Sequence, residues 1–171
     1  MSAHAQRGRL VVGLGSPDRG DDAVGITVSR AVAALLPSVR VVDHEDPTAL
    51  LDVWAGHDHV VVIDAIRSGS PPGTVHQLST GQEGRPVLAG TWACFGPGGT
   101  HAIGLVEMIE LGRALGRLPD RLVVVGIEAG TFDHGRPLSR AVAAAVPAAV
   151  ELVVEALAAG RSQPAAVSDS R

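Results

Sequence analysis

Three residues of the sequence could together hold a divalent metal ion. Asp22 closes the glycine-rich segment GLGSPDRGDD, Asp64 lies near the end of the apolar run HVVVIDAI, and His101 follows FGPGGT. Two carboxylates and one imidazole form a mixed oxygen and nitrogen set that suits a divalent ion with open positions. This set is neither a closed structural zinc site nor the H-E-x-x-H motif of zinc peptidases.

Each of these residues also has an ordinary structural alternative. Asp22 could cap a helix, and His101 could be a polar residue at a helix start. Asp64 is harder to explain in this way, because a carboxylate at the end of an otherwise apolar central strand is often functional. The grouping therefore depends on whether the fold brings the three residues to one place.

The periodicity of the sequence predicts the elements that would do so. Apolar runs predict strands at 9–15, 39–43, 59–66 and 121–128 and an edge strand at 74–79, and helical spacing predicts helices at 21–36, 46–56, 101–116 and 138–160. Pro147 is expected to kink or break the last helix.

This alternation predicts an α/β fold, a three-layer sandwich in which a twisted, mostly parallel sheet of about five strands lies between helices. In that architecture ligands bind beyond the carboxyl ends of the strands, where Asp22, Asp64 and His101 all belong. The length of 171 residues predicts one domain over residues 1–160, and the polar segment 161–171 is expected to be a disordered tail.

Composition excludes several classes of function. The net charge is −4, and Lys is absent, so the lysine of a P-loop and a Schiff-base lysine are excluded. Cys94 is the one cysteine, which excludes an internal disulfide and a cysteine-based zinc cluster. Without a basic run, an aromatic surface, a signal peptide or a long apolar run, we expect a cytoplasmic protein with no nucleic-acid or membrane partner.

A Rossmann-like nucleotide-binding domain is an alternative interpretation of the same glycine turn. Gly13 and Gly15 fit the G-x-G-x-x-G pattern, and Asp43 ends the second strand at about the distance expected of a ribose-binding acid. Position 18 is Asp, however, and two carboxylates at the helix start would repel a pyrophosphate.

Four blocks in the same order, VVGLGSPDRGDDAVG, VVVIDAI, GTHAIGL and LVVVGIEAG, resemble the [NiFe]-hydrogenase maturation proteases. The similarity runs from about residue 10 to 158. It implies a hydrolase, an endopeptidase that removes a C-terminal extension from the precursor of a [NiFe]-hydrogenase large subunit. A nickel-binding assembly factor without hydrolytic activity remains an alternative.

The resemblance also implies roles for individual residues. Asp22, Asp64 and His101 match the family's metal ligands and would act through the metal, and Asp43 matches an aspartate near the cleft, where Glu128 is also expected. The set lacks thiolates, so it should hold nickel weakly, and we expect the substrate to supply the nickel ion. Other divalent ions are expected to occupy the site in vitro. Ser16 and the segment DHEDP depart from the family pattern.

Overall fold

A five-stranded sheet forms the centre of the molecule. The computed structural model describes residues 8–81 and 102–159. The sheet has the order β2-β1-β3-β5-β4, with four parallel strands and an antiparallel β4 at one edge. The strands are β1 (Arg9–Leu14), β2 (Arg40–His44), β3 (His59–Ile66), β4 (Val75–Thr80) and β5 (Arg121–Glu128).

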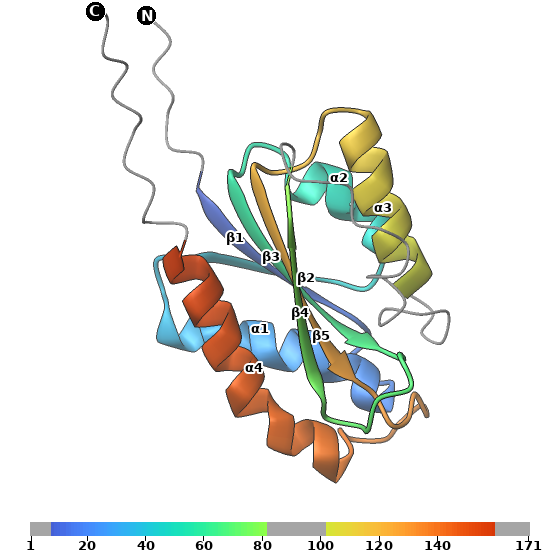
Figure 1. The fold of residues 1–171 in the computed structure, drawn as a ribbon. Coiled ribbons are helices and arrows are strands. Elements are labelled where there is room, and N and C mark those ends of the chain that lie inside the picture. Colours follow the sequence, from blue (N-terminus) through green and yellow to red (C-terminus); the bar gives the residue numbers. More distant parts are fainter. Residues whose placement is uncertain (1–7, 82–101, 160–171) are drawn as a thin grey trace, which may run out of the picture.

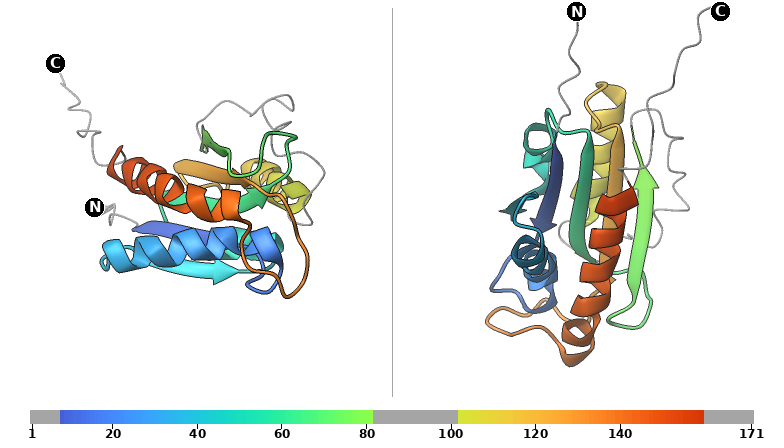
Figure 2. Two further views of the ribbon diagram at one scale, coloured as in Figure 1. Left: turned by 90° about the horizontal axis from the view of Figure 1, so that it is seen from below. Right: turned by 90° about the vertical axis from the view of Figure 1, so that its left-hand side faces the viewer.

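Helices cover both faces of this sheet, which confirms the predicted sandwich (Figures 1 and 2). Helices α1 (Val24–Leu35) and α4 (Arg140–Ala159) lie on one face, and α2 (Leu50–Val53) and α3 (Ala102–Ala114) lie on the other. Two short 3₁₀ helices, η1 (Gly20–Ala23) and η2 (Pro47–Ala49), precede α1 and α2. Asp46 caps η2, since its Oδ1 accepts from the Thr48 amide at 2.8 Å.

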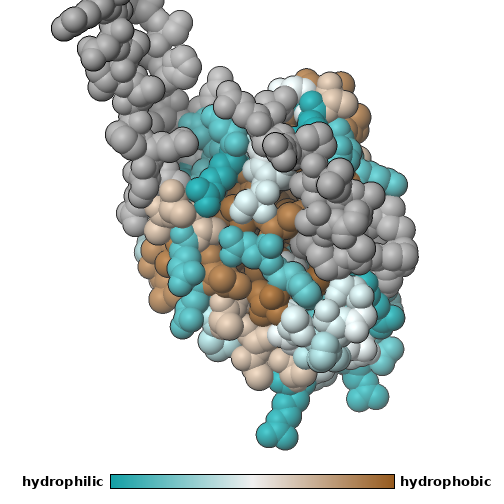
Figure 3. Space-filling view, viewed as in Figure 1, coloured by the Kyte–Doolittle hydropathy of each residue, from teal (hydrophilic) through white to brown (hydrophobic). Residues whose placement is uncertain are grey.

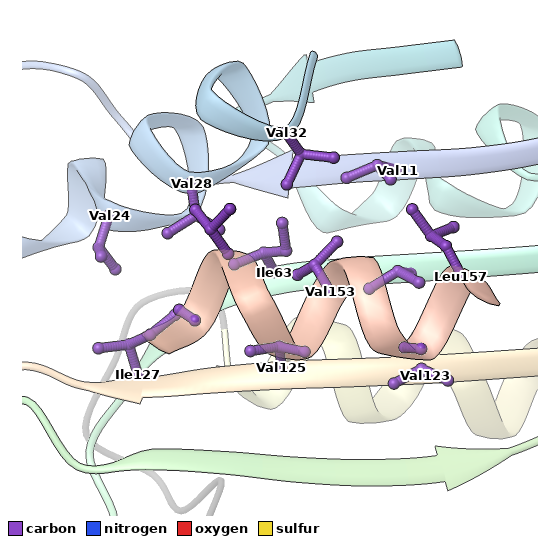
Figure 4. Close-up of a cluster of buried hydrophobic side chains, with 14 of the residues drawn as sticks. Val11, Val24, Val28, Val32, Ile63, Val123, Val125, Ile127, Val153 and Leu157 are labelled. Carbon is purple, nitrogen blue, oxygen red and sulfur yellow. The ribbon is translucent and has the colours of Figure 1, made fainter. Parts of the chain in front are cut away.

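The core has two layers because side chains of a strand alternate between the faces of the sheet. Val61, Ile63 and Val125 point towards α1 and α4, where Val28 and Val153 pack against them (Figure 4). The second layer lies under α2 and α3 and contains Leu10, Val12, Leu14, Leu50, Trp54, Val60, Val62, Ile66, Leu105, Ile109, Leu118, Leu122 and Val124.

Helix α4 has two features that bear on the sequence predictions. It runs from Arg140 to Ala159 without interruption, so the break that was one of the two effects expected of Pro147 is wrong, and the kink stays a prediction. Among the described residues it is also the one helix long and apolar enough, by length and composition, to cross a membrane. Apolar surface gathers over this helix in Figure 3, while its Val150, Val153 and Leu157 are buried in the core against α1 and the sheet.

The amino edge of the sheet buries a histidine between two arginines. The register places His59 of β3 beside Arg9 of β1 and Arg121 of β5. The His59 side chain is 6% exposed, and neither ring nitrogen has a hydrogen-bond partner in the described part of the chain. Burial, and then the positive charges of Arg121 and Arg9, lower the pKa of His59 from 6.5 to about 4.

This lowered pKa predicts a loss of stability in mild acid. The folded protein holds His59 neutral, so its contribution is complete above pH 6.5 and is lost as the pH falls towards 4. Between pH 7 and pH 4.5 we expect a loss of about 1–2 kcal/mol, below the full linkage value because water screens the two half-buried arginines. Urea unfolding at both pH values should show a smaller acid loss for His59→Gln than for the wild type. Equal losses would contradict the assignment.

Candidate functional site at the carboxyl edge of the sheet

The glycine-rich loop after β1 lets η1 and α1 lie directly on the strand ends. Gly15 has a φ of 129°, and a Cβ there would collide with the carbonyl oxygen of Asp22. A Cβ at Gly25 would overlap the carbonyl oxygens of Leu14 and Ile63. The glycines therefore permit a close approach of helix and sheet, and this approach brings Asp22 next to Asp64.

Asp22 and Asp64 are both buried at this junction. The Asp22 side chain is 2% exposed, and its Oδ2 accepts from the Ser16 amide at 3.0 Å. Asp64 is fully buried, and neither of its carboxyl oxygens has a hydrogen-bond partner of good geometry among the described residues. A buried carboxylate without partners is costly, which makes Asp64 the least explained polar group of the core.

The charge of this pair is uncompensated. Burial raises the pKa of Asp64 well above its usual value, the nearby Asp22 carboxylate raises it further, and the Ala65 amide opposes the shift. A cation between the two carboxylates would stabilise their charged forms and so offset both causes of the rise. Over residues 8–81 and 102–159, no three His, Cys, Asp or Glu side chains are close enough to hold a metal ion.

His101, the third predicted ligand, lies outside the described residues. The helix that follows it reaches the site, because α3 begins at Ala102 and Gly104 lines a cleft of about 470 Å³ together with Ser16. Gly104 also packs against η2, since a Cβ there would meet the Pro47 Cγ at 2.7 Å. The complete lining is Ser16, Arg19, Glu45, Asp46, Pro47, Thr48, Gly104 and His134.

Asp43 and Glu128, the other candidate acids, are bound to neighbouring groups. Asp43 accepts from the Ser29 hydroxyl at 2.6 Å and from the Arg30 Nε at 3.0 Å, so it faces α1. Glu128 is 2% exposed and accepts from the Ser68 amide and hydroxyl and from the Gly69 amide. The structure thus brings Asp22 and Asp64 together and gives Asp43 and Glu128 separate hydrogen-bond partners.

Sequence reasoning missed the role of Asp21. The sequence indicates only that two carboxylates lie at a helix start, whereas the structure gives Asp21 and Asp22 different hydrogen-bond partners. Asp21 is fully buried and accepts from the amides of Gly130, Thr131 and Ser139, at 2.8, 3.1 and 2.6 Å. The doubled aspartate was the available signal, since one carboxylate is enough for a cap.

The start of η1 argues against the nucleotide-binding alternative. A pyrophosphate would need free backbone amides at the helix start. The amides of Gly20 and Asp21 instead donate to the carbonyl oxygens of Arg136 and Thr131, at 3.1 and 3.0 Å. The carboxylates of Asp21 and Asp22 are buried at this helix start, and their negative charge would repel a phosphate.

Fold and site together define an α/β protein with a buried carboxylate pair at the carboxyl edge of its sheet. The model of the family described as hydrogenase maturation protease matches residues 30–156, and the chain belongs to this family of peptidases. That match includes Asp64 and His101 and begins after Asp22.

Individual relatives agree with this assignment. The hydrogenase expression/formation protein HupD of Rhizobium leguminosarum bv. viciae is 29% identical over 156 residues, which are 86% of this chain and 73% of the relative. The hydrogenase 2 maturation protease of Escherichia coli (strain K12) is 29% identical over 153 residues, with 86% of this chain and 89% of the relative covered.

Solved structures show the same fold. The E. coli hydrogenase maturating endopeptidase HybD superposes with a TM-score of 0.75 at 26% identity, covering 90% of this chain and 93% of that one. The [NiFe] hydrogenase maturation protease HybD from Thermococcus kodakarensis gives a TM-score of 0.70 at 28% identity, covering 86% and 97%. The expected α/β fold and the expected endopeptidase class are therefore confirmed.

Proposed function

We propose that this endopeptidase removes a C-terminal extension from the nickel-loaded precursor of a [NiFe]-hydrogenase large subunit and recognises the bound nickel. One observation carries the proposal beyond the family assignment. Asp64 is fully buried beside Asp22, and among the described residues neither of its oxygens has a hydrogen-bond partner of good geometry. The pair adjoins the cleft through Ser16, which lines the cleft and donates its amide to Asp22. An uncompensated carboxylate pair in this place suits a cation that arrives with the substrate.

The proposal assigns a separate role to each residue of the site. Asp22 and Asp64 contact the nickel ion, His101 supplies the third ligand, and the Ser16 amide orients the Asp22 carboxylate. Carboxylate and imidazole ligands without a thiolate bind first-row ions with modest affinity, so the enzyme does not need a metal of its own. A bound ion in this position either polarises the scissile carbonyl or activates a water molecule.

Two further properties belong to the proposal. Other divalent ions occupy the carboxylate pair in vitro, because oxygen ligands accept several of them. The protein acts in the cytoplasm, where the apolar helix α4 serves as a core helix packed on α1 and the sheet.

The direct test is cleavage of a purified precursor. Incubation with the nickel-loaded precursor should shorten the large subunit on a gel, and intact mass should account for one released C-terminal peptide. Nickel-loaded mature large subunit is the matched substrate control and should keep its mass. Tight binding of the precursor without cleavage would overturn the proposal and favour a non-catalytic assembly factor.

A further inference from the structure

The segment between β5 and α4, residues 129–139, is held by one buried side chain. Asp21 lies one residue before Asp22, and its carboxylate accepts from the amides of Gly130, Thr131 and Ser139, near both ends of this 129–139 loop. Asp21 is fully buried. Such a carboxylate replaces the hydrogen bonds that water would give to these amides, and it fixes the path of the loop between them.

Backbone contacts join the same two segments. The Gly20 amide donates to the Arg136 carbonyl at 3.1 Å, and the Gly135 amide donates to the Asp18 carbonyl at 2.8 Å. Gly20 has a φ of 56°, and a Cβ there would lie 3.1 Å from the Thr131 oxygen. The 129–139 loop and the loop that carries Asp22 therefore behave as one body.

This body forms part of the cleft beside Asp22. His134, at the exposed tip of the 129–139 loop, lines the cleft together with Ser16, whose amide binds the Asp22 carboxylate. On its other side the loop places the Phe132 ring under the Arg67 guanidinium, 4.8 Å from the ring centroid. The position of the cleft wall relative to Asp22 thus depends on the contacts made by Asp21.

We propose that the 129–139 loop is a substrate-binding wall for the peptide segment next to the scissile bond, and that Asp21 is the residue that positions it. This inference rests on the proposed function. Asp21 touches no reacting atom, so it acts on substrate affinity. The Asp22 carboxylate keeps its own support from the Ser16 amide, and the Asp22 amide donates to the Arg19 carbonyl at 3.1 Å. Loss of the Asp21 carboxylate should therefore change KM and leave kcat nearly unchanged.

The test uses Asp21→Asn and His134→Ala. An amide at position 21 turns one acceptor into a donor that faces a backbone amide, so the loop loosens. We expect Asp21→Asn to raise KM and the Kd for the nickel-loaded precursor at least about 10-fold, with kcat within about 3-fold of the wild type.

His134→Ala should raise KM with an unchanged melting temperature, because the His134 side chain is exposed. In the double variant KM should stay within about 2-fold of that of Asp21→Asn, since the two residues act through one wall.

A measurement without substrate separates this inference from the proposed function. Amide hydrogen exchange of residues 129–139 should accelerate in Asp21→Asn relative to the wild type. Trp54→Phe is the control for general destabilisation, because it removes the Trp54 Nε1 bond to the Arg117 carbonyl (2.9 Å) beside the amino edge of the sheet. It should lower the melting temperature without changing Kd.

The outcomes are distinct. Unchanged exchange of the loop in Asp21→Asn would overturn the positioning role. Faster exchange with unchanged KM and Kd, or fully multiplicative effects of the two substitutions, would overturn the role of the loop as a substrate-binding wall. Absence of cleavage by the wild type would count against the proposed function, while the Kd and exchange measurements would still decide this inference.

Discussion

Asp64→Asn will reduce cleavage of the nickel-loaded precursor at least about 100-fold, in line with the loss of a metal ligand. The amide keeps the size and the buried position of the side chain but removes the negative charge that would contact the ion. Initial rates from a gel assay at saturating precursor will measure the effect. Near-normal cleavage by this variant would remove Asp64 from the site.

The same substitution will make the metal-free protein more stable. Asp64 is fully buried, and its oxygens have no hydrogen-bond partner of good geometry among the described residues. Asn removes the cost of burying an ionisable carboxyl, which should gain about 1–2 kcal/mol and raise the melting temperature by about 3–6 °C for a chain of this length. Thermal unfolding of both proteins in the presence of a chelator measures this difference in melting temperature. The result would show that stability has been given up for function at this position.

The gain should depend on pH with a defined sign. The folded-state pKa of Asp64 is raised above 3.8, so the folded protein favours the protonated form. The wild type therefore loses stability as the pH rises above 3.8 towards the folded-state pKa, and Asp64→Asn does not. The difference in melting temperature between the two proteins should widen over that range. A constant difference would show that charge is not its cause.

Glu128→Gln is the matched control. It makes the same change from carboxylate to amide at an equally buried position of the sheet, but Glu128 already accepts from the Ser68 amide and hydroxyl and the Gly69 amide. Glu128→Gln should therefore lower the melting temperature, opposite in sign to Asp64→Asn. A loss of stability in both variants would mean that Asp64 is a structural residue.

Asp22→Ala and His101→Ala extend the ligand assignment. Each removes a proposed ligand, so cleavage should be lost while the protein stays folded at the assay temperature. Circular dichroism at that temperature is the control for folding. Normal cleavage by either variant would remove that residue from the ligand set.

The main elements of the fold could be predicted because they depend on local patterns. The run HVVVIDAI is fully buried as β3, and the alternation of strands and helices gave the parallel sheet. The break expected at Pro147 does not occur, because a helix packed on both the sheet and α1 can continue despite one missing hydrogen bond.

The candidate site could be predicted only in part. The placement of Asp22 beside Asp64 follows from strand ends that meet at one edge of a sheet. The task of Asp21 could not be found in this way, because its partners Gly130, Thr131 and Ser139 lie more than a hundred residues away along the chain. The same holds for Asp43, whose hydroxyl and guanidinium partners on α1 appear only in three dimensions.

We expect cleavage to depend on nickel that is bound to the precursor. It should not depend on a metal ion stored in the enzyme. The reason is the ligand inventory of the carboxylate pair and His101, which contains no thiolate and so binds first-row ions with modest affinity. Peptidases that keep their own zinc hold it with a fuller set, such as two histidines and a glutamate. The purified protein should therefore contain far less than one equivalent of metal by elemental analysis.

The decisive experiment treats the enzyme with a chelator, removes the chelator, and adds precursor in nickel-loaded or nickel-free form. The nickel-loaded precursor should be cut at the rate of untreated enzyme, and the nickel-free precursor should stay uncut even with excess enzyme. Asp64→Asn, run in parallel, should leave both forms intact, which ties the dependence on nickel to the carboxylate pair. Equal cleavage of both forms by the wild type would rule out nickel as the recognition signal. Cleavage that returns only when free metal is added to the enzyme would instead make this protein an ordinary metalloprotease, with Asp22 and Asp64 holding a resident ion.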